Sequence, residues 1–494
     1  MTVELPVRAT PPEATPPETG LAETARAETA RAETARAETA LPSSRELRQE
    51  ILDLVRQYLA ATRREDPPFV PGHSVVRYAG RVFDESEMTN LVGASLDFWL
   101  TEGRHAARLE NALCRYLGVR SCRLVNSGSS ANLLAFSALT SHRLGERRVG
   151  RGDEVITVAA GFPTTVAPIV QHGAVPVFVD VDRRTANVDV AQLDEALSDR
   201  TRAVMLAHTL GNPFDLDAVV SFCQRHDLWL VEDNCDALGS RYTTRLGPIP
   251  LTRLTGAFGD LATSSFYPPH HMTTGEGGAV YTSSEELDTI VASLRDWGRD
   301  CYCKSGKDNT CGARFAHQLG SLPFGYDHKY TYSHFGFNLK MTDLQAAIGV
   351  AQVPKLEAFG AARRANHARL RERLQPLGDV LELVEATPGA DPSWFGFLMS
   401  VKESAPFSRD ELVAHLERRR VQTRMLFAGN LVRHPCFEAL GPPGEAYRVV
   451  GDLSETDRLM ERALWIGVYP GMSEDQLDYM ADQVGAFCRG APGR

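Results

Sequence analysis

The sequence of 494 residues predicts an α/β protein, in which a large, mostly parallel sheet is followed by a smaller C-terminal α/β domain. Short apolar runs alternate with helical patterns between about residues 120 and 285, and they begin at Glu154, Val175, Ala203, Leu228 and Leu261. Continuous β-rich runs of this kind are typical of strands buried on both faces by helices. No G-x-G-x-x-G motif follows the first strand, so dinucleotide binding is not favoured.

The chain divides into three predicted regions. Residues 1–43 combine the Pro-rich segment TPPEATPPETG with repeats of AETAR and almost no large apolar side chains, so we expect a disordered tail. Residues 44–359 are expected to form the large domain. It begins with a helical face made of Leu47, Ile51, Leu52, Val55, Tyr58 and Leu59. Residues 360–494 mix helices, such as RDELVAHLERRRV, with short strands and are expected to form the small domain. The segment TDLQAAIGVAQVPKLEAF, from Thr342, is predicted to be one long helix.

Composition argues against several classes of function. The formal net charge is -10 without a dense run of Lys or Arg, so nucleic acid and anionic membrane surfaces are not favoured as partners. No apolar run reaches the roughly 18 residues of a membrane span, and the N-terminus lacks the pattern of a secretory signal. We therefore expect a cytoplasmic protein, in which clustered cysteines indicate metal or redox chemistry rather than disulfides.

Two motifs contain groups that suit a phosphate and a pyridine ring. In VNSGSSANLLAF, Gly128 permits a tight turn, and Ser129 and Ser130 place hydroxyl and N–H groups at a helix N-terminus. An ordinary N-cap before a core helix is an equally good interpretation. In VEDNCD, Asp233 ends a predicted strand at the sheet edge where ligands bind. A carboxylate there can keep a pyridinium nitrogen protonated, although a helix cap or a surface ion pair is the simpler interpretation.

Five blocks, in order, give the chain a resemblance to the DegT/StrS-type family of sugar aminotransferases, which are fold type I PLP enzymes. The blocks are the Ser129 loop, VFVDVD, EDN, TTGEGGAV and GFNLKMTDLQAAIGVAQ, and the resemblance covers roughly residues 50–490. It implies an aspartate aminotransferase-like fold and a homodimer with shared active sites. It also implies site roles for several residues: a phosphate site at Gly128, Ser129, Ser130 and Ser265, a ring-stacking Phe162, a partner of the ring nitrogen in Asp233, and Asn338 at the phosphate of the neighbouring subunit.

The lysine that this family uses is replaced in this chain. It lies five residues before the first Gly of TGEGG, a position that here holds His270. Without an amine, PLP cannot be held as a Schiff base, whereas an imidazole can still act as a base. We therefore expect PMP as the cofactor and His270 as the base that acts on a PMP ketimine; a dead enzyme is the alternative. The register favours His270 over His271. By the resemblance, Asp236 lies near the ring's 3'-oxygen and Tyr267 tunes or relays the proton of His270.

Four cysteines have the pattern of a cluster site. Cys301, Cys303 and Cys311 form C-x-C-x7-C, and Cys235 follows Asp233 by two positions. Four thiolates are the usual ligands of a [2Fe-2S] cluster, and C-x-C is tighter than the C-x2-C of zinc ribbons. Chance clustering is the alternative. The other five cysteines are expected to be core or surface thiols: Cys114, Cys122, Cys223, Cys436 and Cys488.

Histidine in place of lysine, together with these cysteines, is similar to one branch of the family, the PMP/iron–sulfur 3-dehydratases of 3,6-dideoxysugar formation. That branch implies reductive removal of the C3 hydroxyl from a nucleotide-linked 4-keto-6-deoxyhexose or 4-keto-2,6-dideoxyhexose. It also implies an NAD(P)H-dependent flavin/iron–sulfur or ferredoxin-type reductase as partner. Three alternatives stay open: a cluster-free 3-dehydratase, an ordinary transaminase with an overlooked lysine, and a non-catalytic homologue that binds a nucleotide sugar or a cluster. CDP and dTDP sugars both stay open as substrates.

Overall fold

The computed structural model describes residues 42–64, 67–301, 303 and 308–490. The chain forms two compact units, Met1–Leu54 and Val55–Arg494. Nearly all of the predicted tail lies outside the described residues. The described part of the first unit is the beginning of helix α2 (Ser44–Arg64), which confirms the helix predicted from the apolar pattern.

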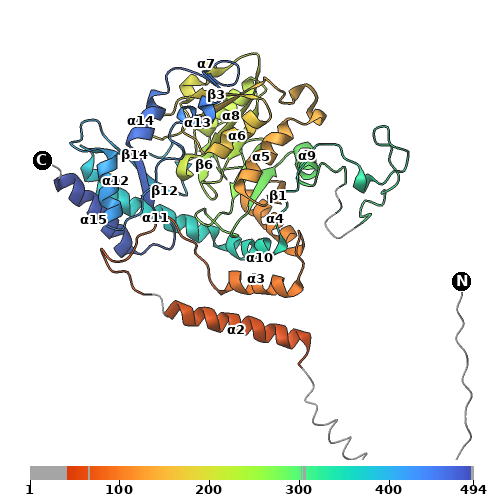
Figure 1. Ribbon diagram of the computed structural model, residues 1–494, viewed down its shortest axis with the longest axis horizontal. Coiled ribbons are helices and arrows are strands. Elements are labelled where there is room, and N and C mark those ends of the chain that lie inside the picture. Colours follow the sequence, from red (N-terminus) through yellow and green to blue (C-terminus); the bar gives the residue numbers. More distant parts are fainter. Residues whose placement is uncertain (1–41, 65–66, 302, 304–307, 491–494) are drawn as a thin grey trace, which may run out of the picture. The chain divides into compact units, whose positions relative to one another are not determined.

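A large sheet forms the centre of the second unit (Figure 1). Its strand order is β1-β9-β8-β5-β4-β2-β3-β13. Neighbouring strands are parallel from β8 to β13, whereas β9 pairs antiparallel with both β8 and β1. All predicted strands are present: β2 (Glu154–Val158), β3 (Val175–Val179), β4 (Thr201–Ala207), β5 (Trp229–Asp233) and β8 (Leu261–Ser265). Strands that the sequence did not reveal complete the sheet: β1 (Ser121–Val125), β9 (Gly278–Thr282) and β13 (Arg448–Val449).

Helices connect the strands and bury both faces of the sheet. Helix α5 (Gly128–Leu139) packs on β8 and β9, and α9 (Glu285–Arg295) packs on β1 and β9. Phe136 and Ile290 bring these two helices into one buried cluster with the sheet. Every residue of β2, β3, β5, β8 and β9 is buried, as expected for a sheet covered on both sides. The other helices before residue 300 are α3 (Glu85–Asp97), α4 (Arg104–Leu117), α6 (Pro163–Gln171), α7 (Leu193–Ala196) and α8 (Leu216–Arg225).

The prediction of one long helix from Thr342 is wrong in one respect, because two helices occupy this segment. Thr342 caps α10 (Asp343–Gln352), and a 3-10 turn over Val353–Lys355 separates it from α11 (Leu356–Leu374). The turn contains Pro354, which has no amide hydrogen and whose ring clashes with the preceding helical turn. Helix α11 then continues far beyond the predicted end.

The C-terminal part confirms the predicted mixture of helices and short strands. Strands β10 (Leu381–Leu383), β12 (Gly396–Val401) and β14 (Ala463–Gly467) form an antiparallel sheet. A second small sheet contains β11 (Ala390–Asp391), β6 (Arg241–Thr244) and β7 (Leu251–Leu254). The helices here are α12 (Arg409–Arg418), α13 (Pro435–Glu438), α14 (Ser454–Arg462) and α15 (Glu474–Gly490). The domain boundary after residue 359 stays a prediction. Within the described ranges, no helix is long and apolar enough to cross a membrane.

Candidate active site

A cavity of about 440 Å³ opens at the carboxyl ends of β4, β5 and β8. Ala207, Asp233 and Ser265, the last residues of these parallel strands, all line it. This is the edge at which ligands bind in open α/β sheets. Most of the predicted site residues line the same cavity: Gly128, Ser129, Phe162, Asp233, Cys235, Asp236, Ser265, Tyr267 and His270.

One end of the cavity has the features of a phosphate site. Ser127 caps α5 and accepts a hydrogen bond from the amide of Ser130 at 3.1 Å. Gly128 lies so close to Ser265 that an added Cβ would be 2.4 Å from the Cβ of that serine. Only glycine fits here, and the amides of Gly128 and Ser129, which precede the capped amide of Ser130, are the ones that an anion would use. Ser130 differs from its predicted neighbours, because it does not line the cavity and its hydroxyl lies 3.1 Å from that of Ser127.

The buried carboxylate of Asp233 lies at the centre of the cavity wall. Its Oδ2 accepts hydrogen bonds from Asn132 Nδ2 and Thr165 Oγ1, both at 2.7 Å. Its Oδ1 accepts from the amide of Cys235 at 3.1 Å. Three donors from different elements orient this carboxylate, as a partner of a ring nitrogen requires. Phe162, the residue before α6, exposes 51% of its surface and lines the cavity nearby.

A histidine–carboxylate pair lies beside Asp233. The Nε2 of His270 is 3.2 Å from Asp236 Oδ1, and only 16% and 11% of the two side chains are exposed. Burial raises the pKa of Asp236, and the hydrogen bond with His270 opposes this shift. Among the described residues, no hydrogen-bond partner contacts the buried His270 Nδ1 or Asp236 Oδ2. Both are buried polar atoms whose hydrogen bonds are unmade in this structure, as at a site that a bound ligand completes. The ring of Tyr267 meets that of His270 edge to face at 6.2 Å between centroids.

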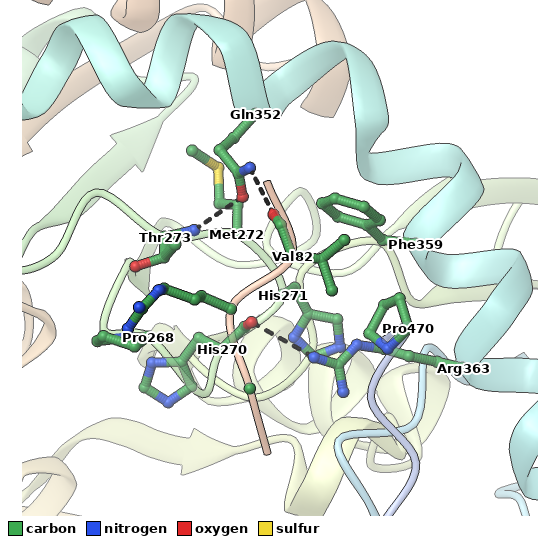
Figure 2. A pocket seen from close by; sticks show the side chains of 12 residues that line it. Val82, Pro268, His270, His271, Met272, Thr273, Gln352, Phe359, Arg363 and Pro470 are labelled. Atoms are coloured by element: carbon green, nitrogen blue, oxygen red, sulfur yellow. Dashed lines mark hydrogen bonds between the residues drawn. The ribbon is translucent and has the colours of Figure 1, made fainter. Parts of the chain in front are cut away.

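The neighbouring histidine is part of the interior and not of this cavity. The Nε2 of His271 lies 2.6 Å from the carbonyl oxygen of Ser393, and burial lowers the pKa of the ring well below its ordinary value. The carbonyl oxygen of His270 accepts a hydrogen bond from the buried guanidinium of Arg363 at 3.3 Å (Figure 2). The structure thus separates the two adjacent histidines, and His270 is the one that faces the cavity.

Sequence reasoning missed the far wall of the cavity. Tyr78, Phe395, Arg424, Phe427 and Trp465 line it. They come from segments that are far apart in the chain, so no local motif or periodicity could have grouped them.

The predicted cysteine ligands lie in two places, with Cys235 at the cavity and the other three in the loop after α9. Cys235 lines the cavity, and burial raises the pKa of its thiol well above the ordinary value. Cys301, Cys303 and Cys311 lie together in the segment after α9 and do not line the cavity. Burial disfavours the Cys303 thiolate, but hydrogen bonds from Thr310 and the neighbouring cysteines outweigh it and lower the pKa to about 7. No group of three metal-binding side chains occurs in the described ranges, which exclude residues 302 and 304–307 of this loop.

Asn338 and the other cysteines complete the predicted set. Asn338 is exposed, forms a β-bridge with Asp296 and does not line the cavity, so its predicted role requires a second copy of the chain. Cys122, Cys223 and Cys488 are buried, Cys114 is half-buried, and Cys436 is exposed. These cysteines are core or surface thiols, as predicted.

Comparison with known proteins relates this geometry to a family. The model of the DegT/DnrJ/EryC1/StrS aminotransferase family matches residues 82–485. The lipopolysaccharide biosynthesis protein RfbH of Salmonella typhimurium is 51% identical over 445 residues, which cover 90% of this chain and 99% of that protein. The dTDP-4-dehydro-2,6-dideoxy-D-glucose 3-dehydratase of Saccharopolyspora spinosa is 51% identical over 442 residues, which cover 90% of this chain and 92% of that protein.

A solved structure is similar over most of the chain. It is the E. coli GDP-4-keto-6-deoxy-D-mannose-3-dehydratase with bound hydrated PLP, with a TM-score of 0.73 and 26% sequence identity. The match covers 83% of this chain and 100% of that one. The fold is therefore that of the PLP-dependent aminotransferases, with a large mixed sheet and a smaller C-terminal part. The chain belongs to the DegT/DnrJ/EryC1/StrS aminotransferase family.

Proposed function

We propose that this protein is a PMP-dependent 3-dehydratase, which removes the C3 hydroxyl from a nucleotide-linked 4-keto-6-deoxyhexose or 4-keto-2,6-dideoxyhexose. One observation carries the proposal: the residue at the family's lysine position is His270, and it faces the cavity paired with Asp236. A histidine in that position can move protons but cannot hold PLP covalently. The name of the Saccharopolyspora spinosa relative, a 3-dehydratase of such a sugar, supports the same reaction class.

The residues at the sheet edge fit a pyridoxamine phosphate. When bound, this cofactor supplies an amine that condenses with a ketone and a ring that accepts electrons. Gly128, Ser129 and Ser265 would hold its phosphate at the start of α5, where a Cβ on residue 128 would fill the space. Asp233 would hold the proton of the ring nitrogen, and Phe162 would cover one face of the ring.

His270 would move the proton on which the elimination depends. Its Nε2 is held by Asp236, which leaves Nδ1 to accept a proton from the carbon next to the cofactor amine. The same nitrogen can return that proton to the departing C3 hydroxyl as water leaves. Asp236 orients the imidazole and stabilises its charged form, the role of a carboxylate behind a catalytic histidine. Tyr267, whose ring meets that of His270, would tune this proton transfer.

We also propose a [2Fe-2S] cluster with Cys235, Cys301, Cys303 and Cys311 as ligands. Such a cluster passes single electrons, so the proposal includes a flavin/iron–sulfur or ferredoxin-type reductase as partner. It rests on the cysteine spacing and on the position of Cys235 two residues after Asp233. Only Cys235 lines the cavity, so cluster binding requires the loop cysteines to come together with it. We also propose a homodimer, which the family resemblance implies, and a cytoplasmic location, which the sequence composition favours.

The first test measures turnover and iron together. Anaerobically purified protein, loaded with PMP, receives dTDP- and CDP-linked 4-keto sugars with a ferredoxin-type reductase and NADPH. Formation of a 3-deoxy-4-keto sugar, with about two iron and two sulfide per chain, supports both halves of the proposal. Dehydration without iron supports the cluster-free 3-dehydratase instead. Absence of any dehydration, in protein that binds PMP and nucleotide, supports a non-catalytic homologue.

A further inference from the structure

The residues that line the cavity fall into two groups of different chemical character. Those at the strand ends include the carboxylates of Asp233 and Asp236, and the carboxylate of Glu276 lines the cavity as well. The far wall is formed by aromatic side chains together with Arg424 and Met425. Among the described residues, Arg424 is the only lysine or arginine that lines the cavity. It does not belong to the strand ends or to the start of α5, which form the proposed cofactor site.

The backbone of Arg424 is held firmly against the C-terminal sheet. Its amide donates to the carbonyl oxygen of Trp465 at 3.0 Å, and the amide of Trp465 donates back at 2.7 Å. The indole Nε1 of Trp465 also donates to the carbonyl oxygen of Met425 at 3.0 Å. Phe427, which follows Met425 by two residues, adopts a left-handed backbone with a φ of 43°. The ring of Phe427 meets that of Phe162 edge to face, with 6.4 Å between the centroids.

The guanidinium of Arg424 is oriented but not neutralised. It lies 3.8 Å from the centroid of the Tyr78 ring, and its Nη1 donates to the carbonyl oxygen of Thr423 at 2.7 Å. No carboxylate of the described residues forms an ion pair with it. Stacking on an aromatic face leaves the edge of a guanidinium, with its N–H donors, available to a phosphate. An exposed, oriented cation at the mouth of a ligand cavity is an anion site.

We propose that Arg424, supported by Tyr78, binds the diphosphate of the substrate nucleotide and so directs the sugar toward His270. This inference rests on the proposed function, because it takes a nucleotide sugar as the ligand. The cofactor monophosphate is the other anion that the cavity would hold. Under the proposed function, that monophosphate is assigned to the start of α5, a different part of the lining from Arg424. The diphosphate is therefore the anion assigned to Arg424.

Binding measurements on full-length, PMP-loaded protein test this assignment without turnover. The probes are dTDP and CDP, with thymidine and cytidine as uncharged counterparts, titrated calorimetrically at low salt. We expect Arg424→Gln to weaken binding of the preferred nucleoside diphosphate about tenfold to a hundredfold, as expected for one lost charge-assisted contact. Arg424→Lys restores part of the affinity, because an ammonium keeps the charge and loses the fork of donors. Arg418→Gln, which removes an exposed arginine of α12 outside the cavity, changes nothing.

The outcomes separate this assignment from the proposed function. Unchanged nucleoside diphosphate affinity in Arg424→Gln overturns it, and so does an equal loss for nucleosides and their diphosphates. Weaker PMP binding in the same variant would assign Arg424 to the cofactor and also overturn it. A wild-type protein that binds these diphosphates through Arg424 but dehydrates no 4-keto sugar contradicts the reaction and leaves the anion site standing.

Discussion

The cofactor end of the cavity and the cysteine loop are stabilised in different ways. Asp233 is buried at the end of a central strand and accepts hydrogen bonds from three different segments. In the loop, Arg314 pairs with Asp327 at 2.6 Å, and Lys329 pairs with Asp308, all on half-exposed or exposed side chains. Pairs of this kind contribute about 0–1 kcal/mol each. The fold alone therefore orients the carboxylate of Asp233, whereas the exposed ion pairs of the loop contribute little to fixing the positions of its cysteines.

The largest expected effect is on the rate of dehydration, and it tests the cofactor end of the cavity. His270→Asn should lower the rate of dehydration by about a thousandfold, within the usual range for loss of a general acid–base group. PMP affinity should stay within about twofold, because none of the phosphate-site residues is altered. Single-turnover dehydration and a PMP titration measure the two quantities. His226→Asn, on the exposed end of α8, is the matched control and should behave as wild type. Wild-type dehydration by His270→Asn would show that another group is the base.

The next effect tests whether the two regions share a cluster. Cys235→Ser should lower the iron and sulfide content from about two each per chain to nearly none, since three thiolates hold a [2Fe-2S] cluster poorly. We expect the Cys235→Ser variant still to bind PMP, which can be followed in the absorption spectrum. The control is Cys436→Ser, at an exposed cysteine outside the cavity. A Cys235→Ser protein with full iron content contradicts the proposed ligand set, and loss of iron in both variants points to general instability.

Features that depend on a short stretch of sequence could be predicted, whereas features formed by residues far apart in the chain could not. The strands were predictable because each is a short run buried on both faces, and Asp233 follows directly from where its run ends. Ser265 was predicted from the family resemblance, and the structure places it at the end of β8. His270 was predictable from the spacing to the TGEGG motif. The arrangement of Arg424, Tyr78 and Trp465 was not, because it depends on the pairing of β14 with residues far away in the chain.

Two errors of prediction have local causes. The interruption between α10 and α11 follows from Pro354, whose effect the apolar pattern across the segment had concealed. Strand β1 was missed because it contains the polar residues Ser121 and Arg123, whose side chains bond to Asp288 on α9. Polar residues in a strand at the sheet edge weaken the apolar signal that identifies a strand.

A smaller effect concerns the phosphate end. Gly128→Ala would place a methyl group against Ser265, so the serine or the helix start must shift. Overpacking of this kind costs about 1–3 kcal/mol. We expect PMP affinity to fall by at least about fivefold, with the pairing of His270 and Asp236 retained. Gly444→Ala, at a glycine whose added Cβ meets no atom within 4 Å, is the matched control. Equal PMP affinity in both variants would exclude the start of α5 as the phosphate site.

The smallest expected effect is a loss of local stability in the cysteine loop, but not in the central sheet, as the pH falls. His334 anchors the far end of the cysteine loop, with hydrogen bonds to Ser141 Oγ at 2.7 Å and to Ser293 Oγ of α9 at 2.9 Å. Burial, followed by the nearby His142 and Arg143, lowers the pKa of its ring to about 4. An unfolded histidine has a pKa of about 6.5, so between these values the unfolded state binds more protons. The anchor is therefore fully stabilising above about pH 6.5 and weakens as the pH falls toward 4.

Because the ring of His334 is partly exposed, the loss should be modest, about 1 kcal/mol of local stability between pH 7.5 and pH 5. Hydrogen exchange of residues 296–300 and 331–338 measures this opening, with β5 as the internal reference. His334→Asn should be looser at pH 7.5, since it loses a hydrogen bond, but should show little further loosening at pH 5. If the loop in wild-type protein exchanges equally at both pH values, the anchor does not depend on a neutral His334. A rise in exchange at pH 5 that is equal in the loop and in β5 would mean that the two regions respond to acid as one.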